Sequence, residues 1–196
     1  MNYTVITKNY PAPEINKKEI LAFMGLKTET AEISLLLKQA LNEAQPFLKY
    51  KLCFIELPLE IRDGICDFDV FSLKSKDLSY TLRECKSVVL FAATIGIGID
   101  RLITKYSRIS PAKSVILSAI GAERVEALCD TFCDELKLKA EITPRFSAGY
   151  GDLNLFSQRE IFSLLGCEKN IGLTLNESML MSPTKSVTAF VGIKKD

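Results

Sequence analysis

The segment RFSAGYGDL, residues 145–153, combines residue types that suit the binding of a small polar ligand. The guanidinium of Arg145 carries five donors in a planar arrangement that matches a carboxylate. The two glycines allow backbone conformations with positive φ, and Tyr150 between them offers a flat ring with a hydroxyl at its edge. We therefore predict a site for an amphoteric molecule with a carboxylate and a planar group. A plain surface loop, in which Arg145 pairs with Asp152 or a helix end, stays open as the alternative.

The sequence contains no histidine among its 196 residues. This absence excludes Ser-His-Asp and Cys-His catalysis, and it excludes histidine ligands to zinc, haem or cobalt from this chain. Any general acid or base must be Asp, Glu, Lys, Tyr or Cys.

A second candidate is the glycine pair in IGIGIDR, residues 95–101. Gly96 and Gly98 follow a strand-like run and precede a helical pattern, as the glycines of a dinucleotide-binding turn do. Arg101 stands where that motif needs its third glycine, so a structural turn is the preferred interpretation. Thr94 and the N–H groups of the turn are left as groups that could face a ligand.

A third polar stretch, TLNESMLMSPTKS at 174–186, lies between apolar runs. Its composition is typical of a hairpin, with Ser182-Pro183 as the expected turn. Met179 and Met181 are expected either in the core or as an adaptable face against a flat partner.

Six cysteines are present, and the chain is long and apolar enough to fold without disulfides. Cys129 and Cys133 are spaced i, i+4 and share a helix face with Val125 and Phe132, which is not a zinc-binding spacing. We expect buried free thiols and, with them, a reducing cytoplasmic location.

Composition fits a single domain with one core, since 47% of residues are hydrophobic and 25% are charged. The formal net charge of +1 argues against nucleic acid as a main partner. The polar N-terminus has no secretory pattern, and the longest apolar run, residues 87–99, is too short to span a membrane. It is typical of a buried strand that leads into a turn.

Periodicity and capping signals predict the elements along the chain. We expect strands at 3–7, 51–57, 68–73 and 87–94, helices at 16–24, 30–48, 77–85, 100–107, 111–140 and 157–165, and two or three strands after residue 173. Gly121 should mark a bend or a close packing contact within the long helix. This irregular order predicts a mixed α+β fold.

The chain also resembles a known family. RFSAGYGD, a short helix and IGLTLNESMLMSPTKSVTAF together resemble the activation domain of cobalamin-dependent methionine synthase, over roughly residues 88–193. The resemblance implies a C-shaped single α+β domain, residues 1–196, with a twisted antiparallel sheet flanked by helices. Within it, residues 1–50 would form a helical N-terminal part and residues 51–196 a sheet-containing core that carries the ligand loop at 145–152. Phe146 stands where the family motif has proline.

The resemblance further implies S-adenosylmethionine as the ligand. Arg145 would bind its carboxylate, and Ser147 and Gly149 would supply main-chain contacts. Tyr150 would lie near the ligand and a corrin ring, and Glu126, with Asp130 as the neighbouring candidate, would supply an acidic contact. No catalytic side chain and no metal ligand is expected from this chain.

The function implied is that of an accessory subunit for a cobalamin-dependent methionine synthase or another corrinoid methyltransferase. It would support reductive remethylation of inactive cobalamin held by the partner, with a flavodoxin-like electron donor as a further candidate partner. The chain would be part of a methyltransferase system for methionine biosynthesis, and not a complete enzyme alone. The alternative is a non-catalytic docking or capping module for a corrinoid protein, with a vestigial ligand site.

Overall fold

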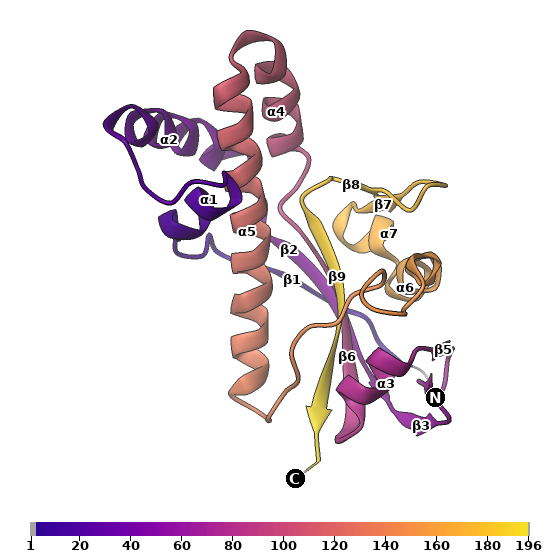
Figure 1. Cartoon of the computed structure of the whole chain (residues 1–196). Helices are drawn as coiled ribbons and strands as arrows, with labels where there is room; N and C mark the ends of the chain where they lie inside the picture. Colours follow the sequence, from indigo (N-terminus) through magenta and orange to yellow (C-terminus); the bar gives the residue numbers. More distant parts are fainter. Residues whose placement is uncertain (1–2, 196) are drawn as a thin grey trace.

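A four-stranded antiparallel sheet forms the centre of the computed structural model, which describes residues 3–195. Its strands are β1 (Ile6–Asn9), β2 (Lys51–Pro58), β6 (Cys85–Thr94) and β9 (Ser186–Lys194), in the order β1-β2-β6-β9. The sheet is strongly twisted in the view of Figure 1. A mixed α+β fold is therefore confirmed.

The central strand β6 is buried on both faces, which explains its continuous apolar sequence. Val89 and Phe91 point into one hydrophobic cluster, whereas Val88 and Leu90 point into the other. Because successive side chains of a strand alternate between faces, one apolar run supplies two cores.

Four helices lie on the side of the first face of the sheet, where α5 contacts the strands and the other three pack against α5 (Figure 1). They are α1 (Lys17–Phe23), α2 (Ala31–Ala44), α4 (Gly98–Ile109) and α5 (Pro111–Lys137), with a 3-10 turn, η1 (Gln45–Phe47), after α2. Asn16 and Thr30 cap the first two helices through their side chains. Helix α5 is unbroken, and its Gly121 gives a close contact, because an added Cβ would lie 2.9 Å from Cγ of Lys185.

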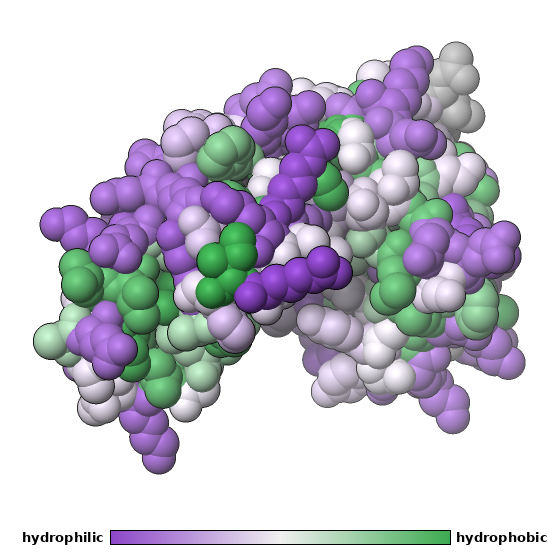
Figure 2. All heavy atoms as spheres, turned by 90° about the horizontal axis from the view of Figure 1, so that it is seen from above, coloured by the Kyte–Doolittle hydropathy of each residue, from purple (hydrophilic) through white to green (hydrophobic). Residues whose placement is uncertain are grey.

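Short elements cover the second face. The helices are α3 (Lys76–Leu82), α6 (Gln158–Leu165) and α7 (Cys167–Ile171), with a 3-10 turn, η2 (Leu155–Ser157). The remaining strands are β3 (Glu60–Arg62), β4 (Ile65–Asp67), β5 (Ser72–Lys74), β7 (Thr174–Leu175) and β8 (Met181–Ser182). Figure 2 shows a deep notch between the half that contains α2 and the half that contains α6, which gives the expected C shape.

Most expected elements are present, and three expectations were wrong. Residues 68–71 form a turn before β5, whereas the strands β3 and β4 were not expected. The helix expected to reach residue 48 ends at Ala44, because Pro46 removes a backbone donor and the chain tightens into η1. The hairpin β7–β8 exists, but its turn comprises residues 176–180, and the cis Ser182–Pro183 bond lies after it.

All six cysteines are free and buried, as expected. Cys129, Cys133, Val125 and Phe132 share one hydrophobic cluster. Within residues 3–195, no helix is both long and apolar enough to cross a membrane.

The polar cluster that ties α2 to α4 and α5 leads to a prediction about pH. Glu43 accepts hydrogen bonds from Lys113 at 2.5 Å and from the hydroxyl of Tyr106 at 2.8 Å. These bonds lower the pKa of Glu43 from its ordinary value of 4.5 to about 2. Its stabilisation is therefore complete above pH 4.5 and is lost as the pH falls toward 2.

We predict that Glu43→Gln lowers the free energy of unfolding near neutral pH and that the difference from wild type disappears at low pH. Urea denaturation at a series of pH values measures this difference. Glu29→Gln, in the exposed loop before α2, is the control and should show no such trend. If the free energy of unfolding of Glu43→Gln stays below that of wild type by a constant amount down to pH 2, the ion pair is contradicted.

Candidate functional site

Arg145 lies against the middle of α5, where two carboxylates hold one side of its guanidinium. Its Nη2 donates to Oε2 of Glu126 at 2.8 Å and lies 3.1 Å from Oδ1 of Asp130. Residues 126 and 130 are one helical turn apart, so their side chains share a face. The sequence placed Arg145 and Glu126 in one site, and the structure brings them together.

The other terminal nitrogen, Nη1 of Arg145, is buried and has no hydrogen-bond partner within residues 3–195. An unpaired buried donor on a charged group is costly, so such atoms are rare in folded proteins. Burial tends to lower the pKa of Arg145, but the nearby carboxylates of Glu126 and Asp130 help to raise it above its ordinary value. The guanidinium therefore stays charged and keeps a free donor.

The loop that follows is anchored to the edge strand of the sheet. Phe146 donates to the carbonyl of Phe190 at 2.9 Å and accepts from its N–H at 2.8 Å. This bridge extends the sheet beyond β9 by one residue. It fixes the backbone beside Arg145 and so determines which part of α5 the guanidinium reaches.

Asp152 fixes the far end of the loop to the N-terminus of α3. Its carboxylate accepts from the hydroxyl of Ser75 and from the N–H groups of Lys76 at 2.8 Å and Asp77 at 3.2 Å. These hydrogen bonds lower the pKa of Asp152, and the bond from Ser75 has the largest effect. The alternative pairing of Arg145 with Asp152 is therefore wrong, because this carboxylate is already used as a helix cap.

The other predicted residues occupy the tip of the loop. Gly149 and Gly151 have φ of +90° and +52°, as expected, and Tyr150 is 58% exposed, with its ring in an edge contact with that of Phe146. The carbonyl of Ser147 accepts from the N–H of Tyr150, and the N–H of Gly149 donates to Leu153. Of these two residues, the N–H of Ser147 and the carbonyl of Gly149 make no backbone hydrogen bond within residues 3–195.

One acidic residue near the site was missed from the sequence. Burial and the carboxylates of Glu123, Asp130 and Glu126, in that order, raise the pKa of Glu19 on α1. Glu19 therefore lies close enough to these α5 carboxylates to feel their charge. Only the packing of α1 against α5 reveals this, because the two residues are distant in sequence.

The glycine turn at 95–98 is structural. The buried hydroxyl of Thr94 accepts from the N–H of Gly96 at 3.2 Å and from Ser186. A Cβ on Gly98 would lie 2.6 Å from the carbonyl oxygen of Phe47, so glycine is needed there for packing. Thr94 is thus not free to face a ligand. Within residues 3–195, no group of three or more His, Cys, Asp and Glu side chains is arranged to hold a metal ion.

A twisted antiparallel sheet, a long helix across one face and an arginine–glycine–tyrosine loop at its edge define a recognisable class. Residues 77–196 match the model of the family described as vitamin B12 dependent methionine synthase, activation domain. Since this match covers more than half of the chain, the protein belongs to that family.

The fold extends the likeness beyond the matched segment. The crystal structure of the MetH reactivation domain bound to AdoHcy superposes with a TM-score of 0.75 at 15% sequence identity. The likeness covers 98% of this chain and 79% of that one, so the N-terminal helices belong to the same fold. No curated protein sequence matches the chain.

The close approach of the loop to α3 leads to a prediction about stability. A Cβ on Gly151 would lie 2.1 Å from Oδ2 of Asp77, and the positive φ adds strain for any other residue. We expect Gly151→Ala to lower the free energy of unfolding by about 2–4 kcal/mol, measured by chemical denaturation.

Gly25→Ala is the matched control, because Gly25 has a φ of +72° with nothing within 4 Å of the added Cβ. It should show the backbone cost alone, about 1–2 kcal/mol. Adding Asp77→Ala to Gly151→Ala should recover part of the loss. Equal losses for the two glycine variants would show that the contact with α3 does not constrain the loop.

Proposed function

We propose that this chain binds S-adenosylmethionine beside Arg145 and presents it to cobalamin held by a methionine synthase or another corrinoid methyltransferase. The observation that carries the proposal is the buried Nη1 of Arg145, which has no partner within residues 3–195. A ligand carboxylate that displaces the atoms covering this nitrogen would satisfy its donor with a charge-assisted hydrogen bond. Family membership and the AdoHcy named for the related crystal structure support the same ligand.

The charges around Arg145 suit the amino-acid end of this ligand. Arg145 offers a donor for the carboxylate, and Glu126 and Asp130 lie within 3.1 Å of the same guanidinium. A ligand ammonium group beside these carboxylates would complete an arrangement of alternating charges. Ser147 N–H and the Gly149 carbonyl are the backbone groups placed to contact the rest of the ligand.

The chemistry of methyl transfer is supplied by the ligand's sulfonium and by the partner's cobalamin. The residues of this chain orient and present the ligand, for which no general base is needed. Tyr150, exposed at the tip of the loop, is the side chain that we place at the partner surface. We also propose that residues 1–196 act as one domain, since β1 pairs with β2 and Asn16 bonds to Glu123 on α5.

The competing function is docking on a corrinoid protein without ligand-dependent chemistry. It is favoured by the ion pairs that Arg145 already makes with Glu126 and Asp130. The two functions differ in whether the chain binds S-adenosylmethionine through Arg145. Only the first function, which includes reduction of cobalamin, needs a flavodoxin-type electron donor.

We predict that Arg145→Gln weakens binding of S-adenosylmethionine and S-adenosylhomocysteine about 30-fold, as expected for about 2 kcal/mol from a lost charge-assisted pair. Isothermal titration calorimetry measures both affinities. Arg101→Gln, on an exposed arginine of α4, is the matched control and should bind as wild type does. If the wild-type chain binds neither compound, the ligand is wrong and the docking function is preferred.

Docking is tested separately with a purified cobalamin-binding fragment of a methionine synthase. Tyr150→Ala should slow or abolish association in biolayer interferometry, because it removes an exposed aromatic ring from the proposed contact. Tyr80→Ala is the control, since Tyr80 on α3 is an aromatic side chain of similar exposure, 68%. Equal effects of the two variants would place the partner surface elsewhere.

A further inference from the structure

A groove lies between α2 and the extended segment before α1, and all of its lining residues except Arg124 precede the matched family segment. One wall is a stripe of α2 from Ser34 to the cap residue Gln45, and the other comprises residues 12–17. Ser34 and Gln45 are eleven positions apart, which corresponds to about 16 Å along a helix, so the groove is elongated. Its volume is about 750 Å³, which is typical of sites for small organic molecules.

The inner surface of the groove is largely apolar. Leu37 is fully buried at its base, and Leu41 and Leu48 continue the apolar surface along its length. Ile15, an exposed isoleucine of the opposite wall, faces the same space. An apolar ligand body placed here would cover surface that is otherwise in contact with water.

Two lysines line the groove from opposite walls. Lys17 begins α1 and Lys38 lies in the middle of α2, and neither forms an ion pair within residues 3–195. Glu14 is the carboxylate among the lining residues, so two positive charges face one negative charge. Like charges on facing walls favour an anion between them.

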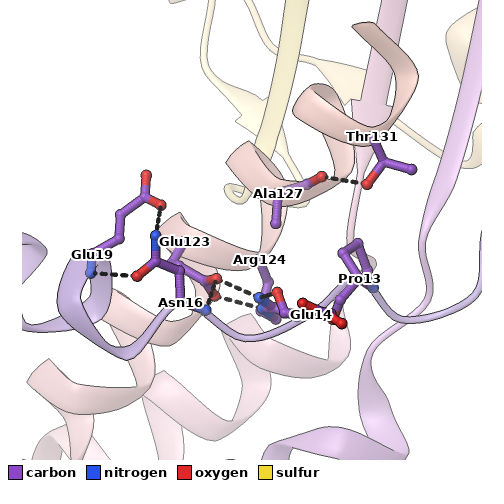
Figure 3. A network of polar contacts seen from close by, with 8 residues as sticks. All are labelled: Pro13, Glu14, Asn16, Glu19, Glu123, Arg124, Ala127 and Thr131. Carbon is purple, nitrogen blue, oxygen red and sulfur yellow. Dashed lines mark hydrogen bonds and ion pairs between the residues drawn. The ribbon is translucent and has the colours of Figure 1, made fainter. Parts of the chain in front are cut away.

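The base of the groove carries polar groups whose charges are already balanced. The guanidinium of Arg124 is held by the carboxylate of Glu123 and donates to the carbonyls of Pro13 and Glu14, both at 2.6 Å (Figure 3). Burial raises the pKa of the neighbouring Tyr50, so its hydroxyl stays neutral. The net positive charge of the groove therefore comes from the two lysines.

We propose that this groove binds a small organic monoanion with an elongated apolar body, such as a medium-chain carboxylate. The acidic group lies between Lys17 and Lys38, and the apolar body extends over Leu37 and Leu41. Arg145 is not among the lining residues of the groove. Occupation of the groove is therefore independent of the ligand proposed for Arg145.

Decanoate is the probe, with decylammonium as a matched compound of opposite charge, and isothermal titration calorimetry is the measurement. Decanoate should bind saturably and more tightly than decylammonium. The double variant Lys17→Gln/Lys38→Gln should weaken decanoate binding roughly 5- to 30-fold. Lys18→Gln, at an exposed lysine next to Lys17 that does not line the groove, should leave it unchanged.

A second pair of variants tests the position of the site. Asn42→Trp fills the groove from α2 and should abolish binding, whereas Gln39→Trp, on an exposed part of α2 outside the groove, should not. Circular dichroism melting confirms that each variant is folded. Absence of saturable decanoate binding, equal binding of decylammonium, or equal losses with Lys18→Gln would each overturn the proposal.

Discussion

Two carboxylates of one helix hold Arg145 by a single nitrogen, and the rest of the site depends on this pairing. Glu126 and Asp130 can both reach Nη2 because α5 is continuous through this region. The guanidinium is thereby held in one orientation, and its second terminal nitrogen has no hydrogen-bond partner within residues 3–195. An arginine that is already ordered loses little side-chain entropy on binding, so more of its interaction energy appears as affinity.

Helix α5 also contains a second arginine–glutamate pair, Arg124 and Glu123, whose hydrogen bonds are complete. Arg124 is almost completely buried, and its donors are used by Glu123 and by the carbonyls of Pro13 and Glu14. Removing one partner of such a closed pair leaves an uncompensated buried charge, which is strongly destabilising. This pair attaches the N-terminal segment to α5, with Arg124 at the base of the groove, whereas the pairing of Arg145 is incomplete, since its Nη1 has no partner within residues 3–195.

Features that depend on one residue and its neighbours along the chain could be predicted from the sequence. Asn16 and Thr30 carry their capping role in their residue type, and the positive φ of Gly149 and Gly151 follows from glycine itself. The hydrogen bond between Asp152 and Ser75, in contrast, joins residues 77 positions apart. It depends on how α3 packs against the loop and could not be predicted from the sequence. Strands of three residues such as β3 are too short to show periodicity, so their pairing appears only in the folded chain.

Phe146 shows how a departure from a motif can preserve a site. A proline at this position could not donate a backbone hydrogen bond, whereas Phe146 donates to Phe190 at 2.9 Å. The bond adds an anchor to β9 directly beside Arg145 and leaves the arginine, both glycines and Tyr150 in place. The substitution therefore tightens the attachment of the loop without removing any group proposed to contact the ligand. A proline here would cost this bond and leave the outward carbonyl of Phe190 on the sheet edge without its donor from residue 146.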